Sequence, residues 1–136
     1  QAAVALIFMD TLEETNQKRS ENAKLYYEGL RDVPGIVLPP RGPRVYHVYH
    51  LYVVQAERRA DLLAHLLAKG VEAKIHYPTP LHLQPALRHL GYKRGDFPVA
   101  EAQAQRILSL PIHEFLSPEQ VNYTIEAVRE FYHASS

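Results

Sequence analysis

The 136-residue sequence contains no cysteine and no tryptophan, and it carries no net formal charge. Without cysteine the chain forms neither a disulfide framework nor a thiolate metal site, and this composition fits a reducing compartment. Lys and Arg total 15, as do Asp and Glu, so there is no positive excess of the kind that attracts nucleic acid or an anionic membrane. We expect no nucleic-acid partner, no membrane partner and a cytoplasmic location.

The sequence also lacks a long hydrophobic run. Its longest, residues 2–9, is much shorter than the ~20 residues that span a bilayer, and it is not flanked by the basic segment of a secretory signal. The run opens a helical pattern, whereas chain ends are usually polar. We therefore expect this sequence to be a piece of a longer polypeptide, in which Val4, Leu6, Ile7 and Phe8 have packing partners that are missing here.

One helical pattern covers residues 1–33, with positions recurring at alternating steps of four and three until Pro34-Gly35 ends it. A continuous helix of ~30 residues would be about 45 Å long, more than the ~37 Å diameter of a globule of this size. We expect the helix either to bend or to connect this domain to another, and we favour the connecting helix. Residues 34–136 are then a small α/β domain.

Within residues 34–136 the patterns predict a proline-rich rigid loop at 34–44, a strand covered on both faces at 46–54, and later segments of both kinds. A half-exposed strand and a short strand are expected at residues 71–75 and 108–110. Helices are expected at residues 58–69, near 85–90, from 96 to about 107, and after the Ser117 capping box. The predicted class is α/β (α+β), with about three strands packed against helices.

The abundant histidines do not suggest a metal site. His47 and His50 on a strand would point to opposite faces. His76 and His82 have no neighbouring Asp, Glu or Cys in sequence to complete a ligand set. The serines have no nucleophile-elbow setting, and the glycines form no phosphate-binding loop. We expect no metal.

The unusual segment is residues 76–85, His-Tyr-Pro-Thr-Pro-Leu-His-Leu-Gln-Pro, which follows the predicted strand at 71–75. Prolines stiffen this loop, and a rigid loop lowers the ordering cost of binding a ligand. The residues alone also allow a merely structural loop with Tyr77 in the core. Both interpretations stay open at this level.

The same segment carries a family resemblance, together with Leu-Gly-Tyr at 90–92, Gly-Asp-Phe-Pro-Val-Ala-Glu at 95–101 and Leu-Ser-Leu-Pro-Ile at 108–112. These motifs closely resemble the DegT/StrS-type aminotransferases, pyridoxal-phosphate enzymes that act on keto-sugar nucleotides. The resemblance covers nearly the whole chain. It implies the small C-terminal domain of the aspartate-aminotransferase-like (type I) fold, with residues 1–33 as its connecting helix and the N-terminal cofactor-binding domain outside this chain.

The resemblance further implies a homodimeric parent enzyme that uses pyridoxal phosphate to move an amino group, from glutamate as donor, onto a keto-sugar nucleotide. None of the lysines occupies the cofactor-lysine motif of the family: Lys18, Lys24, Lys69, Lys74 and Lys93. We therefore expect no catalytic residue in this chain, identify no cofactor-binding residue, and expect the piece alone to be inactive and not to retain the cofactor.

For substrate binding, the resemblance places His76 and Tyr77 at the mouth of the active site, near the sugar nucleotide. His82 is the third candidate, with bracing of the loop as its alternative role. Tyr46 and His50 are expected to be packing residues. Two other functions stay open: a sugar dehydratase or deoxygenase of the same family, which has His in place of the cofactor lysine, and a free-standing, non-catalytic binding module.

Overall fold

The computed structural model describes residues 2–134, which form helices around a small sheet. The elements in chain order are α1 (Ala2–Met9), α2 (Leu12–Leu30), β1 (Ile36–Val37), β2 (Tyr52–Ala56), α3 (Arg59–Ala68), the 3₁₀ helices η1 (Leu81–Leu83) and η2 (Pro85–Leu90), α4 (Pro98–Arg106), β3 (Ile107–Leu110) and α5 (Pro118–His133). Within the described part of the chain, no helix is both long enough and apolar enough to cross a bilayer.

The sheet is antiparallel, with β2 between β1 and β3. Tyr52 lies opposite Leu110, and Ile36 lies opposite Ala56. Alternate side chains of β2 are buried, beginning with Tyr52, because successive residues of a strand point to opposite faces. A three-stranded sheet with packed helices agrees with the predicted α+β class.

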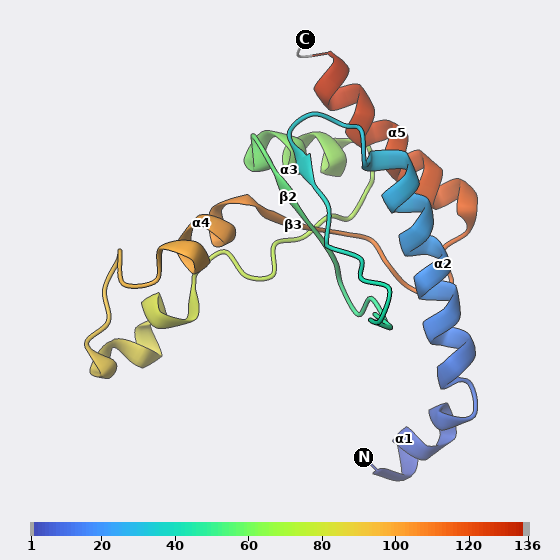
Figure 1. The fold of residues 1–136 in the computed structure, drawn as a ribbon, viewed down its shortest axis with the longest axis horizontal. Coiled ribbons are helices and arrows are strands. Elements are labelled where there is room, and N and C mark those ends of the chain that lie inside the picture. The colour runs from blue at the N-terminus through green and yellow to red at the C-terminus, as the bar shows by residue number, and fades with distance from the viewer. Residues whose placement is uncertain (1, 135–136) are drawn as a thin grey trace.

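Two helices far apart in sequence, α2 and α5, lie side by side on one flank of the sheet (Figure 1). Their close approach depends on Gly29, since a Cβ at that position would lie 2.7 Å from the Cδ1 atom of Ile125. Tyr26 of α2 stacks on Tyr52 at a ring distance of 5.0 Å, and its hydroxyl donates to the Pro111 carbonyl. Burial raises the pKa of Tyr26 to about 12, so its hydroxyl remains a donor at any physiological pH.

The predicted helix boundaries around α3 and α5 are confirmed. Ser117 accepts a hydrogen bond from the Gln120 backbone while the Gln120 side chain accepts one from the Ser117 backbone, which completes the capping box. Gly70 follows α3 with φ of +77°, the left-handed conformation expected of a glycine after a helix.

The predicted strand at 46–54 is wrong in its first half. Tyr49 has φ of +47°, and its backbone N–H donates to Nδ1 of His47 rather than to a neighbouring strand. The strand therefore starts only at Tyr52, and the expectation that His47 and His50 point to opposite faces of a strand does not apply. Tyr46 and His50 are exposed, so their predicted packing role is also wrong; Tyr49 is the buried residue of this segment.

Two further strand predictions need correction. Residues 71–75 alternate in burial as expected but join the sheet only through a bridge between Lys74 and Ser109. The third strand is instead β1, inside the segment expected to be a rigid loop. Gly35 permits the turn that brings β1 beside β2, since its φ is +81° and its carbonyl accepts a hydrogen bond from Glu57.

The helical pattern of residues 1–33 is interrupted at Asp10 and Thr11, where the Thr11 hydroxyl and backbone N–H both donate to the Phe8 carbonyl. The result is two helices, of which α1 projects beyond the end of α2 and away from the sheet (Figure 1). None of the described side chains of α1 is buried. The bend that the length argument allowed is thus present, and α2 ends at Leu30 rather than at residue 33.

At the opposite end of the molecule, residues 77–97 form a protrusion that includes η1 and η2 and leads into α4 (Figure 1). We call this segment the lobe. In the chain, the lobe stands between the segment 71–76 and α4, which is followed by β3. His76 and Tyr77 therefore lie where the lobe joins the sheet, and His82 lies within the lobe.

Candidate functional site

The site begins where the segment 71–76 meets β3. The backbones of Lys74 and Ser109 exchange two hydrogen bonds, with N···O distances of 3.1 and 2.7 Å. Two residues further along, Nδ1 of His76 lies 2.9 Å from the Ser109 hydroxyl, which is buried. The bridge therefore fixes the point from which His76 projects.

His76 differs from its polar neighbours on this segment. Glu72 and Lys74 are exposed and form an ion pair with each other at 2.7 Å. The sequence places His76 on the same polar face, but the structure makes it half-buried and ties it to Ser109. The ring is therefore held in place and not simply solvated.

Tyr77 follows with its side chain 71% exposed, so the alternative of a core tyrosine is wrong. The rings of His76 and Tyr77 meet edge to face, with centroids 5.7 Å apart. Pro78 and Pro80 restrict the backbone that follows. An imidazole and a phenol are thus presented together at the start of the lobe, where one can hydrogen-bond to a ligand and the other can stack on it.

His82 turns instead toward α4. Its Nε2 donates to Oε1 of Glu101 at 3.0 Å, and both side chains are nearly buried, at 8% and 11% exposure. The same Glu101 oxygen accepts from the backbone N–H groups of Gly95 at 2.8 Å and Phe97 at 3.4 Å. These hydrogen bonds lower the pKa of Glu101, and the bond from the Gly95 N–H has the largest effect. The carboxylate is therefore ionised at neutral pH.

The structure therefore brings His76 and Tyr77 together, whereas the His82 side chain ties the lobe to Glu101 of α4. The ring of Phe97 lies 4.7 Å from that of His82, which closes the other side of the imidazole. The pairing of His82 with Glu101 spans 19 residues and was not recognised from the sequence. Its only sequence signal was the motif at 95–101, which the resemblance included without assigning Glu101 a role.

A groove of about 270 Å³ lies between the start of the lobe and α4. Its polar groups come from both walls: Thr79 from the lobe start, Arg94 from the lobe end and Gln105 from α4. A second hollow, of about 310 Å³, is lined by apolar lobe residues that include Leu87 and Tyr92. The lobe thus contributes to one polar and one apolar concavity, and the polar one begins at Pro78, directly after Tyr77.

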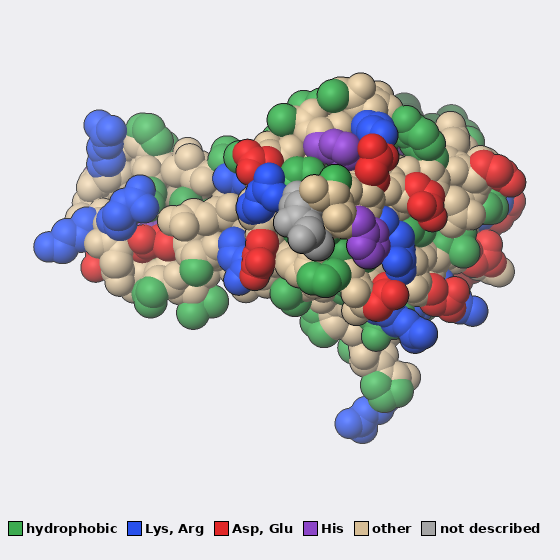
Figure 2. Space-filling model, turned by 90° about the horizontal axis from the view of Figure 1, so that it is seen from above, with side chains coloured by type: hydrophobic (Ala, Val, Ile, Leu, Met, Phe, Trp, Pro, Cys, Tyr) green, Lys and Arg blue, Asp and Glu red, His purple; other side chains and the backbone are tan. Residues whose placement is uncertain are grey.

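The tip of the lobe is cationic. Arg88, Lys93 and Arg94 are all exposed, and Figure 2 shows the Lys and Arg side chains gathered at this end of the molecule. Asp96 is held in the local turn by the Lys93 backbone N–H, at 2.9 Å. An exposed group of cations attracts anionic ligands over a range of several ångströms.

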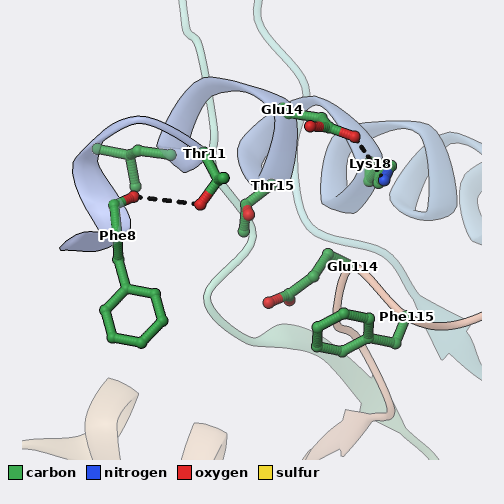
Figure 3. A pocket seen from close by; sticks show the side chains of 8 residues that line it. Phe8, Thr11, Glu14, Thr15, Lys18, Glu114 and Phe115 are labelled. Atoms are coloured by element: carbon green, nitrogen blue, oxygen red, sulfur yellow. Dashed lines mark hydrogen bonds and ion pairs between the residues drawn. The ribbon is translucent and has the colours of Figure 1, made fainter.

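A separate cavity of about 460 Å³ lies at the other end of the molecule, between α1, the first turns of α2 and the loop that precedes α5 (Figure 3). Phe8 and Phe115 project into it from opposite sides, and Glu14 pairs with Lys18 at its rim. Glu114 is fixed by Arg19 at 3.0 Å. Its apolar walls continue the exposed surface of α1.

The described lysines do not fit covalent attachment of pyridoxal phosphate. A lysine that attacks a carbonyl must be an uncharged amine, which a desolvated pocket favours. Lys18 is exposed, and its hydrogen bond to Glu14 raises its pKa, away from the uncharged form. The other lysines are exposed or ion-paired with carboxylates: Lys24, Lys69, Lys74 and Lys93.

Metal ligands are likewise not gathered in the described chain. Between residues 2 and 134, no group of three or more His, Asp or Glu side chains is arranged to hold a metal ion. The chemistry that these residues support is recognition of a polar ligand with an anionic part.

Comparison with known proteins identifies the family. The model of the DegT/DnrJ/EryC1/StrS aminotransferase family matches residues 1–129. The erythromycin biosynthesis sensory transduction protein EryC1 of Saccharopolyspora erythraea is 43% identical over 129 residues, covering 95% of this chain and 35% of that protein. The dTDP-3-amino-3,4,6-trideoxy-alpha-D-glucose transaminase of Streptomyces venezuelae is 43% identical over 131 residues, covering 96% of this chain and 35% of that protein.

The fold agrees with the sequence match. The crystal structure of S. venezuelae DesV in complex with a ketimine intermediate superposes with a TM-score of 0.92 at 42% identity, over 97% of this chain and 36% of that one. The chain thus spans about a third of the length of these relatives. The resemblance in the motifs of the lobe and β3 is confirmed, and the chain belongs to the DegT/DnrJ/EryC1/StrS aminotransferase family.

Proposed function

We propose that this chain is the C-terminal part of an aminotransferase that moves an amino group, from glutamate, onto a keto-sugar carried by a nucleoside diphosphate. The observation that carries the proposal is the 43% identity, over nearly the whole chain, to a relative named as a dTDP-amino-sugar transaminase. The family implies pyridoxal phosphate for the whole enzyme, where it supplies the electron sink. The lysine that holds it lies outside this chain, because none of the lysines here is suited to that role.

Within that enzyme, His76 and Tyr77 bind the sugar, and the lobe shapes the entrance. His76 hydrogen-bonds to a sugar oxygen, and the exposed Tyr77 ring covers the sugar face. His82, held by Glu101, contributes by keeping the lobe folded. Arg88, Lys93 and Arg94 make the lobe attractive to a diphosphate.

The same proposal accounts for α1. Residues 1–33 connect the C-terminal domain, residues 34–136, to a cofactor-binding domain, and the exposed apolar side chains of α1 pack against it. Val4, Leu6, Ile7 and Phe8 are all more than half exposed here, which is unfavourable unless another surface covers them. The whole enzyme is a homodimer, and the lack of cysteine is compatible with a cytoplasmic location.

Two alternatives make different demands on the rest of the protein. A dehydratase or deoxygenase of the family would carry His in place of the cofactor lysine, so the upstream sequence distinguishes it from an aminotransferase. A binding module without catalysis would need no upstream cofactor domain. A start codon directly before Gln1 would favour the module, and an upstream frame with a lysine motif would favour the transaminase.

The test is the complete coding sequence, assayed with glutamate and a nucleoside-diphosphate keto-hexose. We expect amino transfer, and we expect His76→Ala to lower kcat/KM for the sugar nucleotide between a few-fold and roughly a hundred-fold, as loss of one hydrogen bond predicts. Cofactor absorbance should stay unchanged. The matched control is His50→Ala, an exposed histidine on another segment. Wild-type kinetics combined with a sharply lowered Tm would show that His76 is only structural.

A further inference from the structure

Ser109 is a buried hydroxyl in the middle of β3, with 4% of its surface exposed. Its backbone pairs with Val53 of β2 on one side and with Lys74 on the other. Among residues 2–134, its hydroxyl has one hydrogen-bond partner, Nδ1 of His76 at 2.9 Å. The two backbone pairings fix the backbone of Ser109, and the bond to His76 orients its hydroxyl.

The direction of this bond follows from counting hydrogens. A serine hydroxyl has one proton to donate, and a neutral imidazole has one N–H and one bare nitrogen. If Nδ1–H of His76 donated to Ser109, the buried hydroxyl proton would be left without an acceptor, which is unfavourable. If Ser109 donates to a bare Nδ1, its proton is satisfied and the imidazole proton must sit on Nε2.

We propose that Ser109 is a positioning residue that holds His76 in the Nε2–H tautomer, so that the free side of the ring presents a hydrogen-bond donor. Within the described chain, Nε2 of His76 has no partner. The ligand group that fits it is an oxygen acceptor, the keto or hydroxyl oxygen of the sugar. The identity of that ligand rests on the proposed function, whereas the tautomer rests only on the buried pair.

The arrangement also explains why the loop is a useful binding element. The ring is held by the Ser109 bond at Nδ1 and by its edge-to-face contact with the Tyr77 ring, with centroids 5.7 Å apart. A donor fixed before the ligand arrives loses little conformational freedom on binding. Ser109 does not itself reach the ligand, because it is buried behind His76.

The first experiment reads the tautomer directly in the 136-residue chain, by ¹⁵N NMR of the histidine rings near pH 8, where an ordinary imidazole is neutral. We expect His76 to show a protonated Nε2 and a bare Nδ1. We expect Ser109→Ala to give a mixture of tautomers and Ser109→Thr, which keeps a hydroxyl, to restore the first pattern. The matched control is Thr124→Val, which removes another buried hydroxyl bonded elsewhere, to the Gln120 carbonyl.

The wild-type spectrum is decisive even if a variant fails to fold. A wild-type His76 protonated on Nδ1 would overturn the proposal, as would a Ser109→Ala chain whose His76 keeps the Nε2–H tautomer. Retention of the tautomer in Thr124→Val, with its loss in Ser109→Ala, supports it.

The second experiment uses the complete enzyme. We expect Ser109→Ala to raise KM for the sugar nucleotide about 2- to 10-fold, as loss of a positioned hydrogen bond predicts, with kcat changed less and Ser109→Thr restoring KM. If His76→Ala and Ser109→Ala both leave KM unchanged while the tautomer shifts as expected, the sugar-binding role fails and the positioning role stands. A KM effect without a tautomer effect would contradict the positioning role alone.

Discussion

The central body of the molecule, formed by the sheet with α2, α3 and α5, and the lobe at residues 77–97 are ordered in different ways. The body contains the buried apolar cluster, including Leu62, Leu66 and Val121, whose exposed fractions are 0%. In the lobe, every residue of which is described, each residue as a whole is half-buried or exposed, although the His82 side chain is only 8% exposed. Apolar burial stabilises the body, whereas prolines and directed hydrogen bonds around Glu101 hold the lobe.

Under the proposed function, this difference assigns the stability of the chain to the body and ligand binding to the lobe. A segment with few buried apolar contacts opens locally at low free energy, independently of global unfolding. Its aromatic and apolar side chains stay accessible, as with Tyr77 and Leu81. The body therefore dominates the stability of the chain, and under the proposed function the lobe supplies contacts to the ligand.

The strongest test of this division is a core truncation. Leu62→Ala, in the fully buried face of α3, should destabilise the chain by about 2–5 kcal/mol, because it removes packed methyl groups and leaves a cavity. The matched lobe variant Leu81→Ala should stay within about 0.5 kcal/mol. Urea unfolding followed by circular dichroism measures both. Equal losses would mean that the lobe is part of the cooperative core.

A polar residue in the body should have an intermediate effect. The buried amide of Asn22 donates to the carbonyls of His113 and Leu116, and so ties α2 to the loop before α5. Asn22→Ala leaves these carbonyls without that donor and should cost about 1–3 kcal/mol. Thermal melts compare it with Gln17→Ala, an exposed position on α2. An unchanged Tm in Asn22→Ala would show that water replaces the amide as donor to these carbonyls.

The lobe should respond to pH while the body does not. The pKa of Glu101 is held below the ordinary 4.5, first by the Gly95 N–H. Its folded carboxylate is favoured, so this contribution is complete above about pH 4.5 and is lost as the pH falls through the lower folded value. The protection of the Gly95 and Phe97 amides against hydrogen exchange, corrected for the intrinsic pH dependence of exchange, should fall in acid more than the protection of Val121 in the body.

Glu101→Gln supplies the control for that experiment. The variant should speed exchange of the lobe amides at neutral pH and remove their acid dependence, with little change in the global Tm. Lobe and body amides that respond together would contradict the separation of the two regions.

Substitutions in α1 should have the smallest effect on the free energy of unfolding. The side chains of α1 are apolar, like those of the core of the body, but exposed, like those of the lobe. Its uncovered side chains should drive the 136-residue chain to self-associate. Ile7→Glu should reduce association, seen as a lower weight-average mass in sedimentation, and leave Tm unchanged. The control is Lys24→Glu, a charge change on exposed α2. A monodisperse wild-type monomer with α1 ordered would refute the expectation.

The parts of the fold that the sequence predicted correctly depend on local rules. The Ser117 capping box and the turn at Gly70 each involve only a few consecutive residues, and both are confirmed. One error arises where a side chain replaces a backbone partner. His47 takes the Tyr49 N–H, so the aromatic run at 46–50 does not extend β2 even though its residue types favour a strand.

The site shows the same limit. The segment that presents His76 and Tyr77 could be singled out from prolines and the family motif. Ser109 and Glu101 could not be assigned their roles, because they lie 33 and 19 positions along the chain from His76 and His82 and become their neighbours only on folding. Periodicity carries no information about such pairs.

The acceptor that α4 provides to the lobe has a consequence for which lobe positions can change. One carboxylate oxygen of Glu101 accepts hydrogen bonds from His82 and from two backbone N–H groups. Backbone donors are present whatever the side chains around them. Exposed positions such as Leu81, Arg88 and Lys93 can therefore change without loss of that anchor. Under the proposed function, ligand preference can therefore change through substitutions on the lobe surface while the hydrogen bonds to Glu101 stay in place.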